Sequence, residues 1–164
     1  MTYHVIGIDP GLRTTGWAIL VKDKQNRNIH HAASGIIQST NYQDDAERLY
    51  HIFAQLKEVI KYFSIDFAAI ENTYVNKNAK TSIRLAQTRT AAMLACREHD
   101  ISIKEYQAKT IKKRISGNGN ADKETIMQYI CLHLDIKIEE ISPKIVMDQS
   151  DAIAIALCCI SEID

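Results

Sequence analysis

The sequence has no hydrophobic run long enough to cross a bilayer and no cysteine spacing typical of a metal site. Its longest apolar stretch, residues 152–160, is far shorter than the roughly 20 residues that a transmembrane helix needs. No basic segment precedes an apolar one at the N-terminus, so we expect no signal peptide and no contact with a membrane. The 4 cysteines show no CxxC pattern and no Cys–His cluster, which leaves no zinc site. The adjacent Cys158 and Cys159 lie in an apolar run, which predicts free thiols buried in the core. Free thiols fit a reducing compartment, so we expect a cytoplasmic protein.

The sequence also lacks a net charge, which by itself argues mildly against nucleic-acid binding. The distribution argues the other way. Residues 72–114 hold 10 of the 20 basic residues and only 3 acids, a net charge of +7, which leaves −7 on the remainder. This segregation favours a polyanion-binding face beside a carboxylate-rich site. The alternative is a solvated helix face whose counter-charges lie elsewhere in the fold.

At 164 residues and 46% hydrophobic, the chain is predicted to form a single domain over residues 1–164, with no repeat, low-complexity tract or linker. Apolar periodicity predicts strands and helices in a definite order. Strands are expected at 4–8, 14–21, 29–38, 66–71 and 101–106, with a turn at 22–28. Helices are expected at 44–63, with Tyr50 among the regularly spaced apolar positions that form its buried face, and at 79–99, 108–115, 122–134 and 148–160. This order matches the α/β ribonuclease H-like fold, a mixed five-stranded sheet flanked by helices.

Two acids end apolar strands. Asp9 follows the run from His4 to Ile8, and Glu71 follows the run from Phe67 to Ile70. A strand, a crossover helix and a second strand normally form a parallel pair, so both acids are expected at one edge of the sheet, where open α/β sheets place their sites. For Asp9 the alternative is a simple turn residue, because aspartate commonly precedes Pro-Gly.

A second pair of acids, Asp148 and Asp151, lies at the start of the last predicted helix, three positions apart and therefore on one face. They could instead be an N-cap and a first-turn acid. If all four carboxylates converge, they need a counter-ion, and a hard divalent cation such as Mg²⁺ suits oxygen ligands. Two such ions about 4 Å apart would support attack of water on a phosphodiester.

Several motifs resemble the RuvC family of Holliday-junction resolvases, in the same order and over nearly the whole chain. They are Gly7-Ile8-Asp9-Pro10-Gly11 with Thr15-Gly16, Ala69-Ile70-Glu71, Asn76-Lys77-Asn78-Ala79, Gln87-Thr88-Arg89, the stretch 117–123, and Asp148-Gln149-Ser150-Asp151-Ala152. The resemblance implies a homodimeric Mg²⁺-dependent endodeoxyribonuclease that nicks four-way DNA junctions symmetrically in recombination and repair. Mn²⁺ is expected to substitute, and the branch-migration proteins RuvA and RuvB are the expected partners.

The resemblance carries Asp9, Glu71, Asp148 and Asp151 over as the catalytic, metal-binding set. It places Tyr74 near the junction centre and puts Lys112 and Lys123 on the DNA side. Together with the basic tract, the expected DNA contacts are Tyr74, Lys77, Lys80, Arg84, Arg89, Lys112, Lys113 and Lys123. The chain departs from the family at Asn72, Tyr74 and Glu124, where Gln, Phe and Ser are usual.

Three other functions remain open on sequence grounds. The same acids would serve a ribonuclease H-like enzyme that acts on RNA. An actin-like ATPase also has an acid and a glycine turn after its first strand, although 164 residues leave little room for two lobes. A non-catalytic DNA-binding module would need no acidic set. For the homodimer, small and apolar residues on the predicted helix at 79–99 offer a surface for a second copy of the chain.

Overall fold

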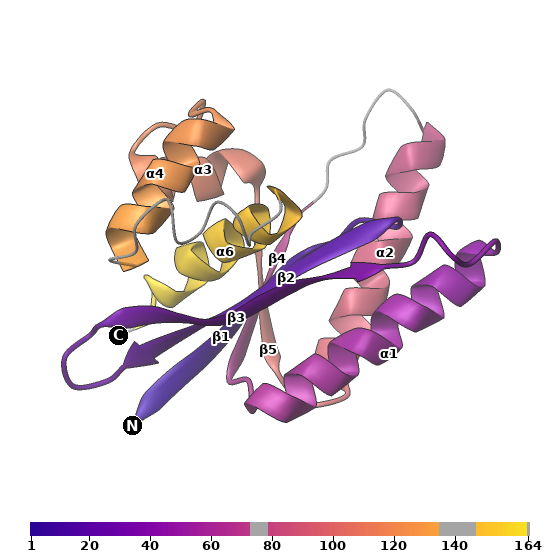
Figure 1. Cartoon of the computed structure of the whole chain (residues 1–164), viewed down its shortest axis with the longest axis horizontal. Coiled ribbons are helices and arrows are strands. Elements are labelled where there is room, and N and C mark those ends of the chain that lie inside the picture. Colours follow the sequence, from indigo (N-terminus) through magenta and orange to yellow (C-terminus); the bar gives the residue numbers. More distant parts are fainter. Residues whose placement is uncertain (73–78, 135–146, 164) are drawn as a thin grey trace.

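Five strands form one sheet at the centre of the structure, in the order β3-β2-β1-β4-β5 (Figure 1). This computed structural model describes residues 1–72, 79–134 and 147–163, with the side chains of residues 147 and 148 excepted. The strands are β1 Thr2–Asp9, β2 Thr14–Asp23, β3 Ile29–Gln38, β4 Phe67–Glu71 and β5 Ser102–Tyr106. β1, β2 and β3 pair antiparallel, whereas β4 pairs parallel to both β1 and β5. The predicted mixed five-stranded sheet is therefore confirmed.

The alternation of side chains along the strands divides the core into two halves. Ile6, Ile8 and Ile70 pack on one face, and Val5 and Ala69 pack on the other. β1 lies in the middle of the sheet with helices on both sides, so its apolar residues are buried whichever way they point. That position explains why β1 is a continuous apolar run and not an alternating one.

Helices α1 and α2 cover one face of the sheet, to the right in Figure 1. α1 spans Asp45–Phe63 and begins after Asp44, whose carboxylate accepts a hydrogen bond from the Ala46 amide. α2 spans Ala79–Arg97 and buries small residues, which lets it lie close to the sheet. The sequence pattern placed Tyr50 on the buried side of α1, and this was wrong. Its side chain is 71% exposed, because the buried stripe is Ile52, Leu56 and Ile60.

Within the described residues, three helices cover the other face (Figure 1): α3 Ala108–Ser116, α4 Lys123–Leu134 and α6 Met147–Ile160. α3 ends at Gly117, whose φ of 76° is left-handed and therefore suits glycine. α6 is buried along most of its length and fills the space between the sheet and the other two helices. Among the helices of the described ranges, none is both long enough and apolar enough to span a membrane.

Most predicted boundaries differ from the structure by one or two residues, and two of these differences have a visible cause. The turn was expected to begin at Lys22, but β2 continues to Asp23, and the buried Lys22 ammonium donates a hydrogen bond to the carbonyl of Ile163. The second helix was expected to reach His99 and ends at Arg97. There the Cys96 carbonyl accepts hydrogen bonds from the amides of both His99 and Ile101, which turns the chain toward β5.

Glu162, just after α6, ties that helix to β5 and α3. Its carboxylate accepts hydrogen bonds from the Tyr106 hydroxyl at 2.6 Å, the Lys104 ammonium at 3.1 Å and the Arg114 guanidinium. Burial disfavours the charged form, but these donors outweigh it and lower the pKa of Glu162 to about 2. The end of α6 is thus held by charge as well as by apolar packing.

Candidate active site

Asp9 and Glu71 lie beside each other at the carboxyl edge of the sheet. Ile8 of β1 pairs with Ile70 of β4 in the parallel register, so the next residue of each strand is an acid at the same level. Val5 and Ala69 point toward α6, and the two-residue period sends Asp9 and Glu71 toward the same side. Both residues are partly buried. The predicted meeting of the two strand ends is confirmed.

Gly7 brings the start of α6 onto these strand ends. A Cβ atom at Gly7 would lie 2.2 Å from the carbonyl oxygen of Ala152 and 2.5 Å from the amide nitrogen of Ala156. Helix and strand backbones therefore touch, as glycine in a strand interior often permits. Because Asp151 immediately precedes Ala152, this contact places it above the edge where β1 and β4 end.

Two hydroxyl groups fix the turn that follows Asp9. Thr15 donates its hydroxyl hydrogen bond to the Gly11 carbonyl at 2.8 Å. The buried Ser39 donates its hydroxyl to the carbonyl of Leu12 and its amide to the carbonyl of Arg13 at 3.0 Å. The sequence did not predict a role for Ser39, because a contact between a turn and the end of a distant strand leaves no local pattern.

A small cavity of about 70 Å³ opens between α3, α4 and α6, and Glu71 and Asp151 form part of its wall. Lys112 and Lys123 line it as well, and its remaining surface is mostly aliphatic. The Lys123 ammonium lies 2.9 Å from a carboxylate oxygen of Asp151. Lys112 donates a hydrogen bond to the Ala121 carbonyl at 2.7 Å and so holds the loop before α4 against α3. The cavity therefore combines two carboxylates and two ammonium groups.

The environment of Glu71 disfavours its negative charge. Burial raises the pKa of Glu71, and the nearby Asp151 carboxylate raises it further, whereas Lys112 and Lys123 act in the opposite direction. The two carboxylates thus repel each other across the cavity. A cation between them would relieve that repulsion and favour the ionised form of Glu71.

The residues at this edge fit a hard divalent cation in their donor chemistry. Asp9, Glu71 and Asp151 supply carboxylate oxygens, the ligands that Mg²⁺ prefers. Within the described part of the chain, no three His, Cys, Asp or Glu side chains are close enough together to hold an ion. The backbone of Asp148 lies in the first turn of α6, and its side chain is outside the described atoms. In this conformation Asp151 is held by Lys123.

Of the predicted DNA contacts on α2, the structure places three. Lys80 is exposed in the first turn of the helix. Arg84 makes two hydrogen bonds to Asp45 of α1, at 2.8 and 3.3 Å, and Arg89 pairs with Glu105 of β5. Both arginines therefore also join elements of the fold, which the charge pattern could not show.

The remaining predicted contacts lie at the cavity, on the outer side of α3, or outside the described residues. Lys112 and Lys123 line the cavity, and Lys113 is exposed on the outer side of α3. Tyr74 and Lys77 lie outside the described residues. The structure thus brings Lys112 and Lys123 to the carboxylates and leaves Lys80 and Lys113 on the surface.

Comparison with known proteins gives one consistent result. The family model for crossover junction endodeoxyribonuclease RuvC matches residues 5–159. The protein of that name from Wolbachia pipientis wMel is 39% identical over 157 residues, which cover 94% of this chain and 91% of that protein. The one from Ehrlichia ruminantium is 38% identical and is covered over 98% of both chains.

Solved structures agree on the fold. Thermus thermophilus RuvC superimposes with a TM-score of 0.84 at 22% identity, covering 99% of this chain and 95% of that one. The same protein in complex with a Holliday junction substrate also gives a TM-score of 0.84, with 95% and 92% of the two chains covered. The ribonuclease H-like architecture expected from the element order is therefore confirmed.

Proposed function

The chain belongs to the RuvC family of crossover junction endodeoxyribonucleases, and from this premise we propose how its residues resolve a four-way DNA junction. The protein is a Holliday-junction resolvase, a metal-dependent nuclease of DNA recombination. We propose that residues 1–164 work as a single nuclease domain that nicks two strands of the junction symmetrically. The observation that carries the assignment of the site is the backbone contact at Gly7, which sets α6 on the ends of β1 and β4.

Asp9, Glu71, Asp148 and Asp151 are proposed to hold the metal. We expect Mg²⁺, two ions per site, with Mn²⁺ as a substitute, because carboxylate oxygens and phosphodiester chemistry suit these cations. Bound there, the ions would activate a water molecule and stabilise the leaving oxygen. The raised pKa of Glu71 supports this assignment, since burial and the Asp151 carboxylate both destabilise its negative charge and a bound cation would offset them.

The lysines and the aliphatic wall would act on the DNA strand and on water. Lys112 holds the loop at Ala121 against α3, so its charge is fixed beside Glu71. Lys123 is paired with Asp151 in this conformation and would be available to a phosphate when a cation takes that carboxylate. The aliphatic side chains from α3, α4 and α6 exclude water from one side of the cavity, which strengthens the electrostatic interactions inside it.

The other proposed DNA contacts are Tyr74, Lys77, Lys80, Arg84, Arg89 and Lys113. Lys80 and Lys113 suit phosphate contacts because both are exposed. Tyr74 and Lys77 remain predictions from the sequence, where an aromatic ring flanked by cations suits an unstacked base. Arg84 and Arg89 could reach DNA only by sharing their guanidinium groups with, or leaving, Asp45 and Glu105.

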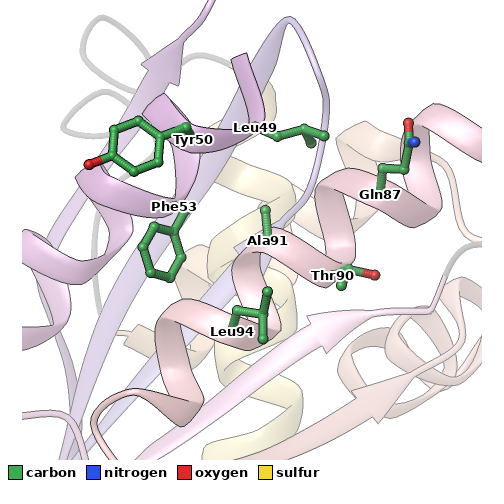
Figure 2. A pocket seen from close by; sticks show the side chains of 7 residues that line it. All are labelled: Leu49, Tyr50, Phe53, Gln87, Thr90, Ala91 and Leu94. Carbon is green, nitrogen blue, oxygen red and sulfur yellow. The ribbon is translucent and has the colours of Figure 1, made fainter. Parts of the chain in front are cut away.

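We further propose a homodimer in which a second copy of this chain covers the groove between α1 and α2. Figure 2 shows the groove, an opening of about 430 Å³ lined by apolar parts of Leu49, Tyr50, Phe53, Ala91 and Leu94. Tyr50 and Leu94 in the groove are 71% and 57% exposed, and Ile83, earlier on α2, is 58% exposed. Contiguous exposed apolar side chains often mark an interaction surface. A second copy is the expected occupant, because symmetric cleavage of two strands requires two sites related by a two-fold axis.

Sedimentation of a surface variant tests the dimer. Leu94→Glu should shift the protein from dimer to monomer at micromolar concentration without unfolding it, since Leu94 is already exposed. Leu132→Glu is the matched control, because Leu132 is 75% exposed on α4, away from the groove. A wild-type protein that sediments as a monomer would refute the dimer directly.

The remaining partners follow from family membership alone. We propose RuvA and RuvB as the branch-migration proteins with which this chain acts. A cytoplasmic location is also proposed, supported by the free thiols Cys96, Cys131, Cys158 and Cys159, all of them buried.

A cleavage assay with three substrates tests the function. With Mg²⁺, the wild type should nick a four-way junction and leave a duplex and an RNA hairpin intact. Asp9→Asn, Glu71→Gln and Asp151→Asn should each abolish nicking, while Asp100→Asn, at a side chain that is 95% exposed, should not. Cleavage of the RNA hairpin in preference to the junction would favour a ribonuclease instead. Wild-type nicking by any one of the three site variants would remove that residue from the set.

A further inference from the structure

A second charged cavity lies at the same edge of the sheet, on the opposite face from the candidate active site. It has a volume of about 390 Å³ and opens between the turn after β1, the start of α1 and the start of α2. Among the described residues, three arginines line it, Arg13, Arg48 and Arg84, together with one acid, Asp45. Three guanidinium groups and one carboxylate give its walls a charge of +2.

The walls of this arginine pocket are held in place by hydrogen bonds. Ser39 binds the backbone of Leu12 and Arg13 and so fixes the turn that carries Arg13. Arg48 donates its Nε–H to the Tyr42 carbonyl at 2.8 Å. A guanidinium has five N–H donors, so that bond leaves the terminal amino groups of Arg48 for another acceptor. Hydrogen bonds therefore hold the backbone that carries Arg13 and the Nε of Arg48 in place.

We propose that the arginine pocket binds a phosphate of the DNA strand that passes over the candidate active site. The proposal rests on the proposed function and adds a contact to it. Arginine is the side chain best suited to phosphate, because its planar fork donates two parallel hydrogen bonds. Arg13 lies in the turn directly after Asp9, so a strand crossing the carboxyl edge from the α6 side meets this pocket next.

Asp45 competes with a DNA phosphate for the guanidinium group of Arg84. Its carboxylate accepts two hydrogen bonds from Arg84, at 2.8 and 3.3 Å, and mimics the bidentate contact that a phosphate would make. Arg84 and Asp45 are both substantially exposed, so the pair costs little to separate. A bound strand would take Arg84 from Asp45, and removing the carboxylate should therefore tighten DNA binding.

The test measures binding in the absence of divalent metal, so that nicking plays no part. The dissociation constant for a four-way junction and for a duplex is followed from low to moderate salt. Arg13→Gln should weaken binding and lower the slope of log K against log salt by about 0.9, the change for one lost phosphate contact. Arg13→Lys should restore most of the slope, because the salt effect counts charges. Lys61→Gln, at the other end of α1, is the matched control and should leave the slope unchanged.

Asp45→Asn should change the affinity for DNA in the opposite direction, toward tighter binding. A variant that is merely unfolded could not bind DNA more tightly. We expect at least about threefold tighter binding at low salt, with the melting temperature close to that of the wild type because the ion pair is exposed. The Asp44 side chain, which caps α1, is left intact. Weaker or unchanged binding by Asp45→Asn, with an unchanged slope for Arg13→Gln, would overturn the pocket.

The outcomes separate this inference from the proposed function. If the wild type nicks junctions with Mg²⁺ but the pocket variants keep the wild-type salt slope, the pocket is refuted and the function stands. If the wild type binds neither junction nor duplex, both are refuted. Inorganic phosphate supplies the last comparison at constant ionic strength. If phosphate raises the melting temperature of the wild type but not of Arg13→Gln, while the salt slopes for DNA are the same in both, the pocket binds a free anion and the proposed strand contact is wrong.

Discussion

Replacing Gly7 by alanine should damage both stability and cleavage, because the added methyl group has no room. Its Cβ would lie 2.2 Å from the Ala152 oxygen and 2.5 Å from the Ala156 nitrogen, both of them backbone atoms that no side-chain rotation can move. Helix α6 must therefore shift away from β1. Overpacking of a core costs typically about 1–3 kcal/mol, and a backbone clash belongs at the upper end. For a chain of this size, about 3 kcal/mol corresponds to roughly 6–12 °C in melting temperature.

The effect on nicking should exceed what the loss of stability explains. A shift of α6 carries Asp151, one of the proposed metal ligands, away from Asp9 and Glu71, and a misplacement of about 1 Å at an active site can cost on the order of a hundredfold in rate. Nicking is measured well below the melting temperature of the variant, with circular dichroism of the same sample to show that it is folded. We expect a folded protein that nicks at least tenfold more slowly than the wild type.

Gly35→Ala is the control that separates the two effects. Its Cβ would meet the ring of Trp17 at 2.7 Å, so this variant should also lose stability. The clash is between β3 and β2 and leaves α6 in place, so nicking by the folded variant should stay within about threefold of wild type. Gly7→Ala with a wild-type melting temperature and wild-type nicking would refute the argument that α6 docks through this residue.

Three further predictions use the charges of the folded state. Glu162→Gln should lower the melting temperature at pH 7, because the low pKa of Glu162 means that its ionised form stabilises the fold. The difference from the wild type should shrink as the pH falls from about 4.5 to about 2, where Glu162 becomes protonated. Metal-free Glu71→Gln should be more stable than wild type at pH 7, and the two should converge in urea midpoint at acid pH, since the raised pKa of Glu71 favours its protonated form in the fold. In the absence of DNA, Lys123→Met should bind Mn²⁺ up to about fivefold more tightly than the wild type, as measured by calorimetry. The limit is about fivefold because the exposed ion pair between Lys123 and Asp151 contributes at most about 1 kcal/mol. Weaker metal binding by the variant would show that Lys123 does not compete for that carboxylate.

The parts of the fold that sequence reasoning predicted correctly depend on local patterns. β1 and β4 are apolar runs ended by an acid, and their parallel pairing follows from the helix between them, so the approach of Asp9 to Glu71 could be foreseen. Tyr50 was misplaced because several faces of α1 are apolar, and only the packing on the sheet selects the stripe through Ile52. A helical pattern fixes spacing, not which stripe is buried.

Contacts between distant polar groups left no trace in the sequence. The pairing of Arg89 with Glu105, and the bond from Lys112 to the Ala121 carbonyl, look like parts of a basic tract until the chain is folded. Gly7 could have been noticed, because a glycine inside a strand of isoleucines often marks a close backbone approach. Its partner on α6 could not.

The docking of α6 on β1 also bears on when during synthesis the enzyme can exist. The acids proposed to hold the metal come from the first strand and the last helix, and the contact between Gly7 and Ala152 closes a loop of almost the entire chain. A nascent chain that still lacks α6 has a sheet edge with two acids and a core open on one face. On the proposed assignment of the metal-binding acids, such a chain lacks part of the nuclease site, so unfinished or C-terminally truncated copies of this protein should not nick DNA.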